Sequence, residues 1–309
     1  MKIVFFGSPA TALPSLNALL GGGHSVELVV TQPDKPAGRG RKLMPSAVKA
    51  FALEHGIPVI GPAKIRTDES ALESVRAAGP DVNIVVAYGQ IIPNAVHYFP
   101  RHHSLNVHFS VLPRYRGAAP VQWTVLHGDR ESGVTIIELN DRMDEGDILA
   151  VRRVPVGPRE TARELEGRLA GIGAELLLET LGRIDSVGRI VQDPGLATLA
   201  PKIKKEDGRV RWEDGAVAVD RQVRALADRP GVYTFFGTKR LNILRGRDLP
   251  PGQAADGPGR ILAVGKEGLT VGCGGGAYLV EELQPEGKGR MAAHVFSLGT
   301  RIDPGDSLG

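Results

Sequence analysis

Short apolar runs alternate with amphipathic segments along the first two thirds of the chain. Apolar runs predict buried strands, and apolar side chains at helical spacing predict the helices between them. Strands are expected over residues 2–6, 26–31, 58–60, 82–87, 105–109, 133–139 and 148–154. Helices are expected up to residue 20 and over residues 46–55, 68–78, 119–127 and 161–181. This alternation favours a doubly wound α/β fold with a Rossmann-like parallel sheet.

The pattern weakens after residue 184. Residues 193–205 contain Pro, Gly and three lysines, a composition typical of a basic linker. A helix over 217–227 and several short strands between Gly, Pro and Asp turns then predict a small OB-like β-barrel. We therefore expect a larger domain over residues 1–188, a basic linker over 189–206 and a barrel domain over 207–309.

Asn106 and His108 lie on the same face of the strand over 105–109, about 7 Å apart along it. In open α/β sheets ligands bind beyond the carboxyl ends of the strands. The turns that follow this strand and the strand over 82–87 are therefore both candidates for the site. An amide and an imidazole at that edge have the chemistry to stabilise an oxyanion and to transfer a proton. The alternative is a half-buried strand whose polar face meets solvent.

An acidic loop over residues 141–147 has three open interpretations: a divalent-ion site, a solvated turn, or the source of a carboxylate that faces His108. Such a carboxylate would hold the imidazole tautomer and stabilise the imidazolium. Ser110 is expected on the same side as His108, so a serine acyl-enzyme is a further alternative, although the chain has no G-x-S-x-G elbow.

The formal net charge is +3, and all of the positive excess lies after residue 199. Residues 35–53 contain five cations and no acid, which suits a polyanion; a solvated segment is the alternative. Within it, residues 32–42 carry two Pro and two Gly and are expected to form a long, mobile, exposed loop.

Other compositional features mainly exclude function classes. Adjacent His102 and His103 point to opposite sides of an extended chain, and the single Cys273 has no motif around it, so neither a metal site nor a catalytic thiol is favoured. One cysteine permits no internal disulfide, and no signal peptide or membrane-length apolar run is present. We expect a soluble cytoplasmic protein.

Several motifs together carry a family resemblance. Asn106-x-His108, the segment over residues 110–120, Gly133-Val134-Thr135 and the segment over 143–149 resemble the signature of the 10-formyltetrahydrofolate-dependent formyltransferases. The segments over residues 31–43, 202–208 and 282–288 are similar to those of family members that formylate methionyl-tRNA. The resemblance covers nearly the whole chain.

The resemblance implies transfer of a formyl group from 10-formyltetrahydrofolate to the α-amine of methionyl-initiator-tRNA. We expect a reaction that requires no metal and a protein that acts as a monomer. It places the catalytic roles on Asn106, His108 and Asp144. The residues that it implies for folate binding are Val86, Tyr88, Gly89, Gln90, Ser110, Val111, Leu112 and Pro113. Those that it implies for tRNA binding are Arg39, Arg41, Lys42, Lys202, Lys204 and Lys205.

Two departures from the family pattern lie close to the expected site. Phe109 stands where a small residue is usual and should alter the packing behind the site, whereas Glu145 replaces a Thr and adds a charge beside Asp144. Rival interpretations are a formyltransferase for an amino-sugar nucleotide, a formyl-folate hydrolase, and a non-catalytic tRNA-binding protein. The basic segment with Arg39 and the basic last third favour a tRNA substrate.

Overall fold

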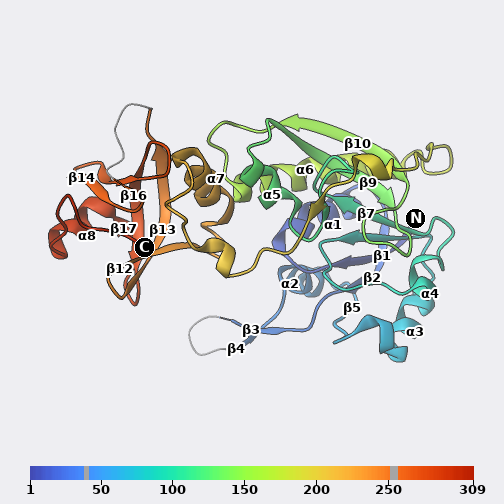
Figure 1. Ribbon diagram of the computed structural model, residues 1–309. Helices are drawn as coiled ribbons and strands as arrows, with labels where there is room; N and C mark the ends of the chain where they lie inside the picture. The colour runs from blue at the N-terminus through green and yellow to red at the C-terminus, as the bar shows by residue number, and fades with distance from the viewer. Residues whose placement is uncertain (38–41, 251–256) are drawn as a thin grey trace. The chain divides into compact units, whose positions relative to one another are not determined.

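The computed structural model describes residues 1–37, 42–250 and 257–309, which divide into two compact units. The larger unit comprises residues 1–120, 131–155 and 165–201, and the smaller unit comprises 121–130, 156–164 and 202–309. The helices are α1 (Leu13–Gly21), α2 (Ala47–Glu54), α3 (Glu69–Ala77), α4 (Asn94–His97), α5 (Pro120–His127), α6 (Ala162–Leu181), α7 (Ala216–Leu226) and α8 (Ala293–Gly299) (Figure 1).

The larger unit is built on a seven-stranded sheet with the order β10-β9-β7-β6-β1-β2-β5. The five strands from β7 to β5 are parallel, whereas β9 and β10 run antiparallel at one edge. The bounds are β1 (Lys2–Gly7), β2 (Ser25–Val30), β5 (Val59–Ile60), β6 (Val82–Val86), β7 (Ser104–His108), β9 (Glu131–Glu138) and β10 (Ile148–Pro155). The sheet confirms the predicted α/β fold, and every strand predicted for it is present.

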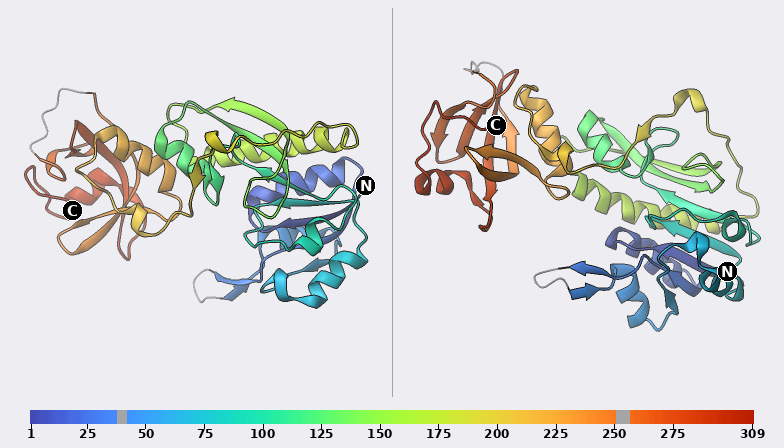
Figure 2. Two further views of the ribbon diagram at one scale, coloured as in Figure 1. Left: turned by 45° about the vertical axis from the view of Figure 1, so that its right-hand side comes forward. Right: turned by 60° about the horizontal axis from the view of Figure 1, so that its bottom comes forward.

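Helices cover both faces of this sheet, as a doubly wound fold requires (Figure 2). On one face Val4 and Phe6 of β1 belong to the same buried core as Leu72 and Val75 of α3. On the other face a Cβ atom at Gly173 of α6 would lie only 2.8 Å from Cγ1 of Val107, so the glycine lets α6 approach β7 closely.

Side-chain caps explain where three helices of the chain begin. Ser46 accepts a hydrogen bond from the backbone N–H of Lys49, and Asp68 accepts one from Ala71. Thr161 and Glu164 form the predicted capping box, in which the Glu164 carboxylate accepts from the Thr161 N–H at 2.9 Å. These hydrogen bonds lower the pKa of the Glu164 carboxyl.

The basic segment differs from the loop predicted over residues 32–42. Its described residues form two short antiparallel strands, β3 (Lys35–Ala37) and β4 (Lys42–Met44), instead of an irregular loop. The backbone pairing needs no apolar alternation, which is why the sequence pattern missed it. Arg39 and Arg41 lie outside the described residues, as does the side chain of Lys42.

The smaller unit contains an antiparallel sheet of order β12-β13-β16-β15-β14, with β17 added beside β16. Its last residues pair with both edges of the sheet, because Phe236 bridges Leu308 and Arg260 bridges Ser307. This closes the sheet into the predicted OB-like barrel. The strands are β12 (Val232–Phe236), β13 (Lys239–Asp248), β14 (Ile261–Gly265), β15 (Gly268–Gly272), β16 (Ala277–Pro285) and β17 (Met291–Ala292).

Candidate active site

The carboxyl end of β7 presents the two side chains singled out from the sequence. Asn106 pairs with Val85 of β6 and Ile137 of β9, and His108 pairs with Thr135 of β9. Val85 belongs to the core on the α3 face, so Asn106 and His108 point to the face opposite Val107 and α6. His108 is only 5% exposed, whereas Asn106 is half-buried.

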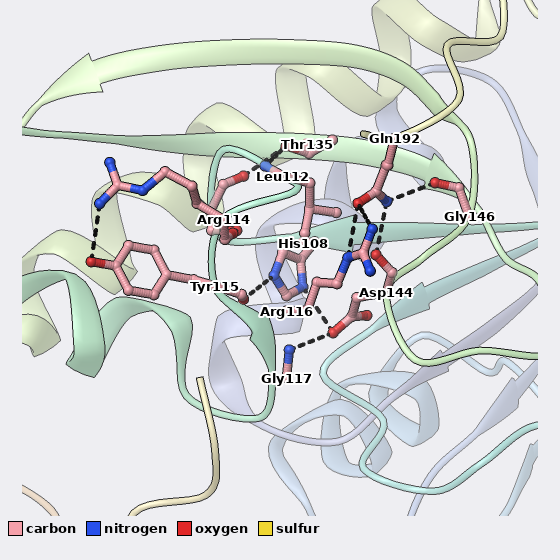
Figure 3. Close-up of polar contacts among 11 residues, drawn as sticks. His108, Leu112, Arg114, Tyr115, Arg116, Gly117, Thr135, Asp144, Gly146 and Gln192 are labelled. Carbon is pink, nitrogen blue, oxygen red and sulfur yellow. Dashed lines mark hydrogen bonds and ion pairs between the residues drawn. The ribbon is translucent and has the colours of Figure 1, made fainter. Parts of the chain in front are cut away.

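Both ring nitrogens of His108 face oxygen atoms (Figure 3). Nε2 donates a hydrogen bond to the backbone carbonyl of Tyr115 at 3.0 Å, and Nδ1 lies 3.7 Å from Oδ2 of Asp144. A neutral ring with its proton on Nε2 therefore has its lone pair on Nδ1, and a proton gained there would meet a carboxylate. This arrangement suits a group that takes up a proton and is stabilised while it holds it.

The backbone around Asp144 is tightly constrained. Asp144 has a positive φ of 54°, and its carboxylate accepts a hydrogen bond from the N–H of Gly117 at 2.8 Å. A Cβ atom at Gly146 would overlap the carbonyl oxygen of Glu138, so only glycine allows the loop to return to β9 at that point. Of the three interpretations of the acidic loop, the structure supports the carboxylate that faces His108.

The segment after β7 is a tight turn held by hydrogen bonds of the Ser110 hydroxyl and of Thr135 from β9. The Ser110 hydroxyl donates to the Arg114 carbonyl at 2.7 Å. The Thr135 hydroxyl donates to the Ser110 carbonyl and accepts from the N–H of Leu112. Neither ring nitrogen of His108 contacts Ser110, because both face the other oxygens described above. This geometry does not favour the acyl-enzyme alternative.

The turn after β6 presents backbone more than side chains. Tyr88 is 1% exposed, with its ring edge-on to Phe6 in the core, and burial raises the pKa of its hydroxyl. Its carbonyl accepts a hydrogen bond from Gln32, and Gly89 has a φ of 78° where a Cβ would overlap the Gln32 amide. The Gln90 amide is bound to the backbone of Ile65 and Pro62.

A cavity of about 420 Å³ opens beside this turn. Its lining combines two cations with polar and apolar side chains: Ala63, Lys64, Arg66, Thr67, Gln90 and Ile91. Leu112, after β7, is buried in an apolar cluster with Ile137 and Ile148. The cavity therefore borders the turn after β6, whereas Leu112 anchors the turn after β7 to the sheet.

Sequence reasoning missed a buried group that supports the Asp144 loop. The Gln192 side-chain amide donates to the carbonyls of Asp144 and Gly146, both at 2.8 Å (Figure 3). Its carbonyl accepts from Nε and one terminal nitrogen of Arg116, whose other terminal nitrogen lies 3.2 Å from Glu145. The charge that Glu145 adds beside Asp144 is thus paired with a buried cation.

Comparison with known proteins identifies the family. A family model described as "Formyl transferase" matches residues 1–181, and one described as "Formyl transferase, C-terminal domain" matches residues 202–301. The chain belongs to the formyl transferase family. Its family membership accounts for both units, since each family model matches one of the two sheet-bearing parts of the chain.

Curated relatives of this formyl transferase are similar over their full length. Methionyl-tRNA formyltransferase from Geobacter sulfurreducens is 45% identical, and the alignment covers 100% of this chain and 97% of that protein. Methionyl-tRNA formyltransferase from Thiobacillus denitrificans is 42% identical over 100% of both chains.

Solved structures share the fold at lower identity. The sugar 3N-formyl transferase WlaRD superposes with a TM-score of 0.65 at 19% identity, covering 93% of this chain and 98% of that one. HypX from Aquifex aeolicus in complex with tetrahydrofolic acid gives 0.62 at 19% identity, covering 96% and 47%. Methionyl-tRNA formyltransferase from Clostridium thermocellum gives 0.57 at 19%, covering 80% and 92%.

The remaining candidates of the formyl transferase belong to the smaller unit. Lys202, Lys204 and Lys205 are exposed. Cys273 is buried, which raises the pKa of its thiol to about 12 and makes it a poor nucleophile at neutral pH.

The described residues contain neither a cluster of metal-binding side chains nor a helix suited to a membrane. His103 contacts Glu138 at 2.8 Å, and within residues 1–37, 42–250 and 257–309 no group of three metal-binding side chains was found. No helix in this part of the chain is long and apolar enough to span a membrane.

Phe109 has the packing role expected of it. The side chain is 7% exposed, and its ring lies 3.5 Å from the position that a Cβ atom of Gly173 in α6 would occupy. It therefore fills space between β7 and α6 on the face away from His108. A larger residue at this point is accommodated because α6 has a glycine opposite it.

Proposed function

We propose that this formyl transferase transfers the formyl group of 10-formyltetrahydrofolate to the α-amino group of methionyl-initiator-tRNA. The observation that carries the chemistry is the buried His108, with Asp144 at Nδ1 and Asn106 on the same face of β7. The relatives named methionyl-tRNA formyltransferase, up to 45% identical over the full chain, support the substrate. They do not favour an amino-sugar nucleotide or hydrolysis of formyl-folate.

The proposed reaction is a direct attack of the methionyl amine on the formyl carbon. The bond from that carbon to N10 of the folate then breaks, and the departing tetrahydrofolate nitrogen receives the proton that the amine loses. Asn106 donates a hydrogen bond to the oxyanion that develops on the formyl oxygen. Its side chain has no hydrogen-bond partner among the described residues, so the amide is available for this contact. His108 assists the oxyanion and moves the proton that the attacking amine must lose. Asp144 stabilises the imidazolium and orients the ring. No covalent enzyme intermediate and no metal take part.

For the folate we propose the turn over residues 86–90 and the segment over residues 110–113, at the carboxyl ends of β6 and β7. Val86, Tyr88 and Gly89 contribute backbone groups to this proposed contact. In the second segment Val111 and Pro113 are partly exposed, whereas Ser110 and Leu112 are buried and support the turn. Because the Tyr88 ring is buried and the Gln90 amide is hydrogen-bonded to Ile65 and Pro62, we propose that these two residues contribute their backbone or support the turn.

For the tRNA we propose the hairpin segment with Arg39, Arg41 and Lys42, and the linker lysines. Lys202, Lys204 and Lys205 are exposed, as phosphate contacts require. We propose the domain boundaries 1–188, 189–206 and 207–309, which the family matches to residues 1–181 and 202–301 support. Acting in translation initiation, the enzyme would work in the cytoplasm, and we propose that it does so as a monomer.

The test is a formylation assay of purified protein with 10-formyltetrahydrofolate and charged initiator tRNA. Free methionine and elongator Met-tRNA serve as acceptor controls. Transfer to the initiator substrate alone is the expected result. A lack of transfer to initiator Met-tRNA under conditions where the protein binds folate would overturn the proposal.

A further inference from the structure

Gln192 is 5% exposed and lies 48 residues after Asp144, in the segment that follows α6. Its amide makes two donations and accepts twice, so its hydrogen-bonding capacity is filled. The reversed orientation would place its NH₂ group against the Arg116 guanidinium and its oxygen against two carbonyls. Chemistry thus leaves Gln192 a single orientation.

The groups that Gln192 holds are the backbone carbonyls on either side of Glu145 in the catalytic loop. Asp144 occupies the left-handed backbone region, which costs free energy in a non-glycine residue and persists only where neighbouring contacts maintain it. The two hydrogen bonds from Gln192 and the one from the Gly117 N–H provide those contacts. The position of the Asp144 carboxylate therefore depends on Gln192.

The same segment supports the other partner of His108. The Thr198 hydroxyl accepts a hydrogen bond from the N–H of Tyr115 at 2.9 Å, and the backbone carbonyl of Thr198 accepts one from the N–H of Arg116 at 2.8 Å. Tyr115 is also in the left-handed region, with a φ of 64°, and its carbonyl binds Nε2 of His108. Strand β11 (Leu199–Ala200) then pairs with β8 (Arg116–Gly117), where Gly117 contacts Asp144.

We propose that Gln192 is a positioning residue that sets the Asp144 carboxylate against His108. Thr198 positions the other partner of His108, because its hydroxyl accepts from the N–H of Tyr115, whose carbonyl meets Nε2. Neither touches the reacting atoms. The proposal rests on the proposed function only for the reaction that His108 and Asp144 serve. The positions of these two side chains can be tested without the tRNA substrate. The segment over residues 192–200 is then part of the active site rather than only a connection to the basic lysines that follow it.

The test compares near-isosteric variants of the full-length protein. Gln192→Met removes all four hydrogen bonds of the amide, and Thr198→Val removes the acceptor for Tyr115 while leaving the backbone pairing intact. Asn83→Leu is the matched control: Asn83 is fully buried and donates to Val96 and Ser104, at the end of β6 remote from His108. Asp144→Asn gives the reference signal for a disturbed pair.

The first readout is the ¹⁵N resonances of the His108 ring in histidine-labelled protein, assigned with His108→Ala. Gln192→Met and Thr198→Val should shift these resonances, as Asp144→Asn should. Asn83→Leu should leave them unchanged even where it lowers the Tm by the same amount. The second is steady-state kinetics, where Gln192→Met should lower kcat about 100-fold with the KM for both substrates within about threefold of wild type.

Each outcome decides a separate point. Unchanged His108 resonances and unchanged kcat in Gln192→Met would overturn the proposal, and so would unchanged resonances in Thr198→Val if Gln192→Met failed to fold. Shifted resonances in a protein whose wild type does not formylate Met-tRNA would retain the positioning role and reject the proposed function.

Discussion

Replacing Asp144 with asparagine removes a charge from the site while conserving its shape. Asparagine tolerates the left-handed backbone of this position and can accept the hydrogen bond from Gly117, so the loop should keep its structure. What is lost is the attraction between a protonated His108 and the carboxylate, whose nearest atoms are 3.7 Å apart. The variant therefore isolates the electrostatic part of the proposed mechanism.

The size of this loss follows from the distance. At an effective dielectric constant of 20, the attraction across 3.7 Å is about 4.5 kcal/mol. Desolvation of the two groups offsets part of it, so we expect about 3–4 kcal/mol of transition-state stabilisation to be lost, or roughly 10²–10³-fold in kcat. Binding of tRNA and folate should change far less, because Asp144 is proposed to act on the imidazolium.

Single-turnover formylation at saturating tRNA measures this step, and a separate binding titration measures affinity. Asp141→Asn is the matched control, because Asp141 is an exposed acid of the same loop that contacts Tyr98 and His97. A turnover of Asp144→Asn within threefold of wild type, or an equal loss in Asp141→Asn, would refute the reasoning.

Three further predictions concern the tRNA, the loop and the pH dependence of stability. Arg39→Ala should raise the KM for tRNA about tenfold or more and leave folate binding intact; a matched loss of both would indicate misfolding instead. Gly146→Ala should cost about 1–3 kcal/mol of stability, measured by denaturant unfolding, and lower turnover as well, because the new Cβ overlaps the Glu138 carbonyl. Burial lowers the pKa of His97, with Asp141 raising it and His103 lowering it further, so the unfolded chain binds a proton near pH 6.5 that the folded protein binds only at lower pH. Stability should therefore fall as the pH drops below about 6.5, and His97→Gln should flatten that part of the Tm–pH curve; an unchanged slope would contradict the assignment.

Regular elements were predictable where apolar side chains repeat with a clear period. The strands of the larger sheet and its longer helices follow from that period, and so does the shared face of Asn106 and His108. Helix α4 (Asn94–His97) has only four residues, too few for a period to appear, and the strands β3 and β4 pair through their backbones without apolar alternation. Both were missed for these reasons.

The site was predictable only in part because its contacts join distant segments. The strand pattern identified His108, and its carboxylate partner needed the family resemblance to select Asp144 from several acids. Nothing in the local sequence marks Gln192 or Thr198, which reach partners 46–83 residues away. The buried ring of Tyr88 shows the same limit, since the side of a turn on which a side chain lies depends on the packed core.

The most direct test of the account is the single-turnover rate of formyl transfer to initiator Met-tRNA by His108→Ala. We expect a rate lower than wild type by about 10²–10⁴-fold, with tRNA and folate affinities within about threefold, because the variant loses proton transfer and keeps the binding surfaces. A near-normal rate would contradict the central claim that the pair of His108 and Asp144 carries the chemistry.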